Sequence, residues 1–80
     1  MKIAVPKEIK NNENRVGLVP SGARQLVQDG HEVYVQHNAG MGIGIPDEEY
    51  IKVGAKIVNT LEDAFNIGEM IIKVKVEVKK

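Results

Sequence analysis

The sequence lacks cysteine and tryptophan, and it has no excess of either charge, because 11 Lys and Arg residues balance 11 Asp and Glu residues. The missing cysteines exclude a disulfide framework, a thiolate metal site and a cysteine nucleophile. A formal net charge of zero provides none of the positive field to which nucleic acids or anionic membranes are attracted. No apolar run reaches the roughly 20 residues of a transmembrane helix, and the apolar run after Met1 is too short for a signal peptide. We therefore expect a cytoplasmic, soluble protein without nucleic-acid or membrane partners.

Size sets a second limit. The chain has 80 residues and a mass of 8.8 kDa, so it forms at most one small domain. With two Tyr and one Phe as its only aromatic residues, Val, Ile, Leu and Ala must build the core. A domain of this size buries only about 60–65% of its unfolded surface. A complete two-substrate enzyme with its own dinucleotide-binding domain does not fit, so we expect a small module or one part of a larger protein.

Strand and helix patterns alternate along the chain. Apolar or alternating runs predict strands at 2–5, 32–36, 56–58 and 70–78, and helical spacing predicts helices at 20–29, 46–53 and 60 to about 68. This alternation favours right-handed βαβ units. The predicted fold class is α/β: a short parallel sheet of βαβ units, comparable to a truncated half of a flavodoxin-like or Rossmann-like domain. We expect the second and last strands to flank the first, with the third outermost.

The predicted helices carry recognisable end signals. Pro20 suits the first position of a helix, although Val19 before it has no side-chain oxygen to cap free amides. Gly30 is a plausible C-terminal cap. Thr60, followed three residues later by Asp63, resembles a capping box. These signals place the helix boundaries independently of the apolar pattern.

The segment between the first strand and first helix is the most informative. Residues 6–19 make it fourteen residues long, whereas such connections usually take about 2–6. It leaves the carboxyl end of a strand, where ligands bind in parallel α/β sheets. Arg15 supplies its only guanidinium, a planar group that can hold both oxygens of a small carboxylate. The spacing alone slightly favours the other interpretation, a solvated polar loop in which Arg15 has no function.

The last predicted strand alternates strictly. Its apolar face contains Ile72, Val74, Val76 and Val78, and its polar face contains Lys73, Lys75, Glu77 and Lys79. A polar face indicates that the strand lies at the edge of the sheet, borders a cleft or lacks a covering layer of helices. A lysine in a cleft can polarise a carbonyl group or hold an anion. The same lysines could instead simply solvate an edge and discourage pairing between edges.

Two further features are less informative. The glycines at 40, 42 and 44 do not match the dinucleotide fingerprint, because Ile45 occupies the third glycine's place and the segment follows the second strand. We interpret this segment as a turn-rich loop whose glycines allow positive φ. His31 and His37 have no second ligand at metal-binding spacing, so we interpret both as structural or solvated and expect no metal.

Seven short motifs, taken in their order along the chain, resemble the N-terminal segment of the alanine dehydrogenases. The resemblance rests on Lys2-Ile3-Ala4-Val5-Pro6-Lys7-Glu8, Asn11-Asn12-Glu13-Asn14-Arg15-Val16, Pro20-Ser21-Gly22, Gly30-His31-Glu32-Val33, Ala39-Gly40-x-Gly42, Asp47-Glu48-Glu49-Tyr50 and Ile72-Lys73-Val74-Lys75. The related proton-translocating transhydrogenase subunits share the architecture, but the run from Asn11 to Val16 is more similar to alanine dehydrogenase.

Members of that family convert L-alanine, NAD⁺ and water to pyruvate, ammonia and NADH. The resemblance implies that Arg15 binds the substrate carboxylate. It implies that Lys75 contacts the carbonyl or amino-bearing carbon and takes part in catalysis. It also implies that the catalytic histidine, an aspartate and the NAD-binding domain lie beyond residue 80. We therefore expect a single truncated substrate domain that binds no cofactor and is inactive alone, with pyruvate or L-alanine bound weakly if at all.

The sequence also departs from the family. After Lys75 the family usually continues with Glu-Pro, whereas Val76 and Glu77 prolong the alternation here. We expect the exposed last strand or the uncovered sheet face to pair with a second copy, giving a homodimer. Two alternatives remain open at this point. One is a non-enzymatic scaffold derived from the family, and the other is a subunit that becomes active only with a separately encoded remainder.

Overall fold

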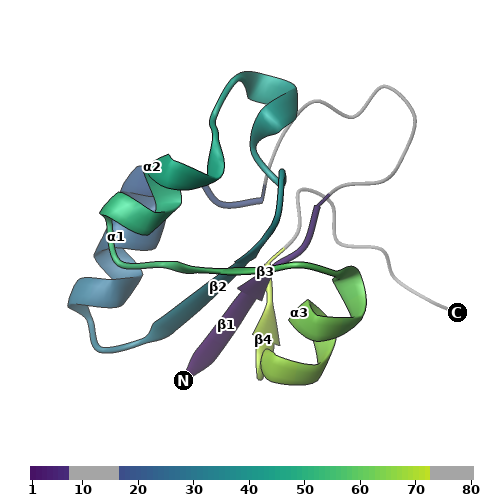
Figure 1. Cartoon of the computed structure of the whole chain (residues 1–80). Helices are drawn as coiled ribbons and strands as arrows, with labels where there is room; N and C mark the ends of the chain where they lie inside the picture. The colour runs from purple at the N-terminus through teal and green to yellow at the C-terminus, as the bar shows by residue number, and fades with distance from the viewer. Residues whose placement is uncertain (8–16, 73–80) are drawn as a thin grey trace, which may run out of the picture.

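The computed structural model describes residues 1–7 and 17–72, which form a four-stranded parallel sheet (Figure 1). The elements in chain order are β1 (Lys2–Val5), α1 (Pro20–Gln28), β2 (Glu32–Gln36), the 3₁₀ helix η1 (Met41–Ile43), α2 (Asp47–Lys52), β3 (Lys56–Val58), α3 (Leu61–Ile67) and β4 (Met70–Ile71). The strand order is β3-β2-β1-β4. The predicted α/β class and strand order are therefore confirmed, and α1 and α2 end within one residue of their predicted bounds.

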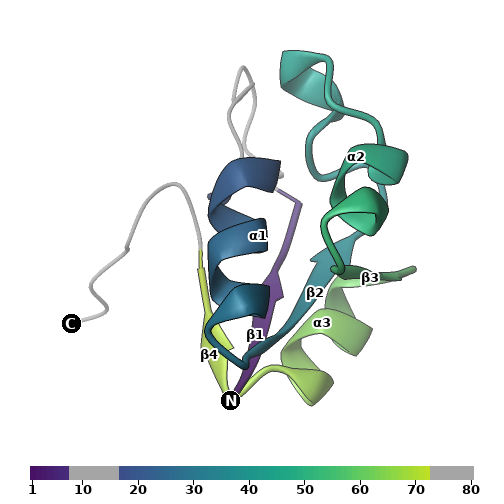
Figure 2. The same cartoon turned by 90° about the vertical axis from the view of Figure 1, so that its left-hand side faces the viewer.

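Helices cover both faces of the sheet unequally (Figures 1 and 2). The face under α1 and α2 carries the larger core, formed by Val5, Val33 and Val35 from the strands with Ala23 and Tyr50 from the helices. On the opposite face, α3 alone supplies the buried Ala64 against residues of β1 and β3. Alternate residues of the strands enter the two cores, because successive side chains of a strand point to opposite faces.

β1 lies between β2 and β4, and its two neighbours are reached by connections on opposite faces. β1 pairs with β2 from Lys2↔Glu32 to Val5↔Val35, and it pairs with β4 at Ile3↔Met70 and Ala4↔Ile71. The chain passes through α1 on one face before β2, and through α3 on the other face before β4. The boundary between β1 and β4 is therefore the topological switch point, beside which ligands bind in open α/β sheets.

The helix ends follow the predicted signals. α1 begins at Pro20 without a side-chain hydrogen bond from Val19. Gly30 adopts φ +96° after α1, a conformation that favours glycine. At α3, Thr60 Oγ1 accepts a hydrogen bond from the Asp63 N–H at 3.0 Å. These local contacts explain why the boundaries could be placed from sequence.

The described part of the last strand is short. β4 comprises Met70 and Ile71, and the N–H of Ile72 continues the pairing by donating to the Ala4 carbonyl at 2.9 Å. The predicted alternation from Ile72 to Val78 lies almost wholly outside the described residues. Within residues 1–7 and 17–72, no helix is long and apolar enough to cross a membrane.

Candidate functional site

The carboxyl end of β1 is tied to β2 by a side chain. Pro6 follows Val5 and has no N–H, so it cannot donate to the sheet. The next donor is the N–H of Lys7, and it binds Oε1 of Gln36 at 2.8 Å. Gln36 is the last residue of β2. Its side chain thus accepts a hydrogen bond from the first backbone N–H after β1.

The start of α1 is tied to α2 in a similar way. Tyr50 lies on α2 with no exposed surface, and its phenol donates a hydrogen bond to the Leu18 carbonyl at 2.7 Å. Burial, with a smaller contribution from the negative charge of Asp47, raises the pKa of Tyr50 to about 12. The phenol therefore keeps its proton, and its role as a donor, to a higher pH than an exposed tyrosine does.

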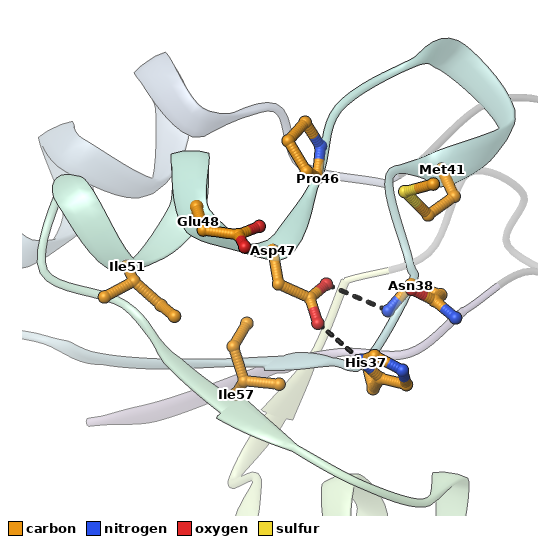
Figure 3. Close-up of a pocket in the computed structure, with 8 residues that line it drawn as sticks. All are labelled: His37, Asn38, Met41, Pro46, Asp47, Glu48, Ile51 and Ile57. Carbon is orange, nitrogen blue, oxygen red and sulfur yellow. Dashed lines mark hydrogen bonds and ion pairs between the residues drawn. The ribbon is translucent and has the colours of Figure 1, made fainter.

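A hollow of about 470 Å³ opens at the carboxyl ends of β2 and β3 (Figure 3). It is lined by His37, Asn38, Met41, Pro46, Asp47, Glu48, Ile51 and Ile57. The side chains of Met41 and Ile51 are about half exposed at its rim. It therefore combines an apolar wall with one polar corner, where the chain leaves β2.

Asp47 organises that polar corner. Its Oδ2 lies 2.5 Å from Nδ1 of His37, and its Oδ1 accepts the N–H of Asn38 at 2.9 Å (Figure 3). Asn38 has φ +66°, in the left-handed region, which asparagine adopts more readily than most residues other than glycine. One largely buried carboxylate thus holds the turn after β2.

His37 pairs with Asp47, and 56% of its side chain remains exposed. This agrees with the sequence-based interpretation, although the pairing with Asp47 was not foreseen. The only signal was that acidic residues open the predicted helix at 46–53. His31 is partly buried, and its Nδ1 has no hydrogen-bond partner. Within residues 1–7 and 17–72, no three His, Cys, Asp or Glu side chains gather in a metal-binding arrangement.

The glycine-rich segment is built for packing. A Cβ on Gly40 would lie 2.8 Å from the Ile45 carbonyl oxygen and 3.2 Å from the Tyr50 ring. Gly40 has φ −95°, so the expectation that the glycines serve positive φ is wrong at this position and correct at Gly44, where φ is +78°. Close approach of the backbone to Ile45 and Tyr50, which sequence alone does not reveal, is the physical reason for Gly40.

The two predicted substrate residues, Arg15 and Lys75, both lie outside the described residues. The structure does describe the strands from which their segments depart. β1 precedes Arg15, β4 precedes Lys75, and these strands are parallel neighbours. Whether the two side chains meet stays a prediction.

The fold and its switch point define a small parallel α/β domain of the kind that binds ligands at the carboxyl ends of its strands. The sequence profile of the family described as "Alanine dehydrogenase/PNT, N-terminal domain" matches residues 4–80. The chain therefore belongs to the alanine dehydrogenase/PNT family and matches its N-terminal domain.

Individual relatives agree. An alanine dehydrogenase of Methanococcus maripaludis is 53% identical over 79 residues, which cover 99% of this chain and 21% of the relative. An alanine dehydrogenase of Geobacillus stearothermophilus is 54% identical over 76 residues, which cover 94% of this chain and 20% of the relative. The chain thus spans about a fifth of the length of these relatives.

Solved structures give the same result. An L-alanine dehydrogenase superposes with a TM-score of 0.88 at 49% identity, and a transhydrogenase from Sinorhizobium meliloti superposes with a TM-score of 0.82 at 32% identity. Each match covers 91% of this chain and 20% of the longer one. The β3-β2-β1-β4 domain is therefore a shared unit of both kinds of protein.

Proposed function

We propose that this chain supplies part of the substrate site of an NAD-dependent alanine dehydrogenase, with Arg15 and Lys75 binding pyruvate or L-alanine. The reaction would be the interconversion of L-alanine, NAD⁺ and water with pyruvate, ammonia and NADH. The chain matches about a fifth of its alanine dehydrogenase relatives, so it would contribute binding groups and depend on other parts for hydride transfer.

One observation carries the proposal. β1 and β4 are adjacent parallel strands at the topological switch point, so the segments that follow them start at the same edge of the sheet. Ala4 pairs with Ile71, so the two strands end nearly level with each other. Arg15 follows the end of β1, and Lys75 follows β4 by only four residues. This topology supports a shared site for the two cations.

The chemistry of the two side chains fits a 2-oxo acid. A guanidinium can hold both carboxylate oxygens at once and so fix the orientation of the substrate. A lysine ammonium can donate to the carbonyl oxygen and stabilise the negative charge that develops there when ammonia adds to the carbonyl carbon. NAD would supply or accept the hydride, and we expect it to be bound outside this chain.

A titration of the ¹⁵N-labelled chain with pyruvate, followed by ¹H–¹⁵N correlation spectra, tests this proposal. We expect saturable shifts that weaken at least about tenfold in Arg15→Ala, because a charge-assisted bidentate contact is lost. Arg24→Ala and Lys52→Ala are matched controls, since both residues are exposed on α1 and α2. Binding to Arg15→Ala as tight as to these controls would contradict the role of Arg15.

Propionate separates the two proposed roles, because it has the carboxylate of pyruvate without the 2-oxo group. The unmodified chain should prefer pyruvate over propionate. Lys75→Ala should lose that preference while still binding both anions, and Arg15→Ala should weaken both alike. A preference for pyruvate that survives in Lys75→Ala would exclude contact between Lys75 and the carbonyl oxygen.

Two other expectations stay predictions. The first is a homodimer through the last strand or the uncovered sheet face, and most of that predicted strand lies outside the described part of the chain. The cytoplasmic location likewise awaits a direct test. The mass of the chain measured by light scattering at high concentration decides the first, since a monomeric mass would exclude the dimer.

A further inference from the structure

Two side chains hold the backbone on either side of residues 8–16. Gln36, at the end of β2, accepts the N–H of Lys7 at 2.8 Å. Tyr50, on α2, donates to the carbonyl of Leu18 at 2.7 Å. Lys7 and Gln36 are 29 residues apart in sequence, and Leu18 and Tyr50 are 32 residues apart. Both bonds are therefore tertiary contacts made by the β2–α2 unit.

The Gln36 contact extends the link between β1 and β2 past the end of their paired backbones. The paired register of β1 and β2 runs as far as Val5↔Val35, and Pro6 follows without an N–H. Gln36 comes directly after Val35, and its side chain reaches back to Lys7. A glutamine side chain thus holds the backbone where the chain leaves β1.

The Tyr50 contact is strongly favoured by burial. The ring has no exposed surface, and an unpaired phenol in such a place would carry the full cost of its desolvation. Leu18 lies just before Pro20, where α1 begins, so no helical hydrogen bond competes for its carbonyl. A tyrosine side chain thus holds the backbone where the chain enters α1.

We propose that Gln36 and Tyr50 are positioning residues for pyruvate binding, an inference that rests on the proposed function because Arg15 lies between Lys7 and Leu18 in the sequence. Neither residue is proposed to touch the substrate. Gln36 holds the backbone at Lys7, before Arg15 in the sequence, and Tyr50 holds it at Leu18, only three residues after Arg15. We call Lys7 and Leu18 the two anchors. Fixed anchors lower the conformational entropy that binding must remove, and this strengthens binding without a new contact to the ligand.

The test uses two variants that each remove one hydrogen-bonding group while keeping the size of the side chain, Tyr50→Phe and Gln36→Met. The chain offers a matched control for each. Tyr34→Phe removes a phenol that donates to Glu32 at 2.8 Å, and Gln25→Met removes an amide that donates to Asp29 at 3.1 Å. Neither control bond involves Lys7 or Leu18.

We expect the dissociation constant of pyruvate to rise about threefold to tenfold in Tyr50→Phe and in Gln36→Met, which corresponds to one net hydrogen bond. The two controls should stay within about twofold of the unmodified chain. Urea midpoints are measured for all five chains, and binding is measured where each is fully folded. A shift in urea midpoint without a change in dissociation constant would identify Tyr50 and Gln36 as purely structural and overturn the inference.

The heteronuclear ¹H–¹⁵N NOE of the Arg15 amide is measured in parallel without pyruvate. It should fall in Tyr50→Phe and Gln36→Met and stay unchanged in the controls. If the unmodified chain binds no pyruvate, the proposed function fails in this chain, and the NOE alone decides whether the two residues position Arg15. An NOE equal in all five chains would overturn the inference, with or without binding.

Discussion

Gly68, which follows α3, lies so close to Ala4 of β1 that a Cβ at residue 68 would come within 2.6 Å of the Ala4 Cβ. Ala4 has no exposed surface, and it belongs to the small core beneath α3. The α3 face of the sheet is thus closed by two small residues in contact, because any larger pair would push the turn after α3 away from β1.

The first prediction follows from this contact. Gly68→Ala should lower the free energy of unfolding by about 1–3 kcal/mol, the usual cost of overpacking a core. Urea unfolding measures the change. In the double variant Gly68→Ala with Ala4→Gly, the facing methyl group is removed. This variant should recover part of the loss caused by Gly68→Ala, beyond what the two single variants predict by addition. Strict additivity would show that the two residues do not press on each other.

The raised pKa of Tyr50 predicts that the folded chain loses stability at alkaline pH. Its pKa is raised from 10 to about 12 in the folded chain, so the folded state keeps a proton that the unfolded state releases above pH 10. The contribution is complete below pH 10 and is lost as the pH rises toward 12, by up to about 2–3 kcal/mol.

The difference between the unmodified chain and Tyr50→Phe isolates this contribution, because every other titrating group is common to both. The urea midpoints of the unmodified chain and of Tyr50→Phe, measured at pH 8, 10 and 11, should converge or cross as the pH rises. The pKa of Tyr34 is also raised, chiefly by its hydrogen bond to Glu32, and that effect cancels in the comparison. A difference that is constant over this range would contradict the raised pKa of Tyr50.

Removing Asp47 should destabilise the fold more than removing His37, although the two side chains form one pair. Asp47→Ala should lower the free energy of unfolding by about 1–2 kcal/mol, because the part-buried N–H of Asn38 loses its acceptor. His37→Ala should cost less than about 1 kcal/mol, since His37 is mostly exposed and such pairs contribute little. Thermal or urea unfolding of the two variants measures both values. Equal costs would mean that the His37 pair, and not the Asn38 turn, is what Asp47 stabilises.

Most of the fold could be predicted from the sequence because its signals are local. Pro20 and Gly30 limit α1 through their own backbone preferences, and Thr60 begins α3 through a bond to Asp63 only three residues away. Short apolar runs separated by helical patterns favour parallel βαβ units in almost any context. The strand order followed from the same rules, and the resemblance to alanine dehydrogenases followed from motifs that are continuous in the chain.

The candidate site could be predicted less completely. Arg15 and Lys75 were singled out by loop length and strand alternation, and the resemblance gave them roles, but both lie outside the described residues. Gly40 was assigned to a turn by its type, whereas its actual constraint is the nearness of Ile45 and Tyr50. A glycine needed for positive φ and one needed for space look the same in a sequence.

The sequence by itself determined which segments of this protein become strands and helices, since those choices depend on neighbours within one or two turns. Only the tertiary structure decided that Gln36 holds Lys7, that Tyr50 holds Leu18 and that Gly68 meets Ala4. These contacts join residues 29, 32 and 64 positions apart, and side-chain chemistry at one position does not specify a partner at such a distance. Lys7 and Gln36 meet beyond the carboxyl ends of β1 and β2, Tyr50 of α2 meets Leu18 just before α1, and Gly68 meets Ala4 where the chain passes from α3 into β4. Each of these arrangements exists only once the chain is packed.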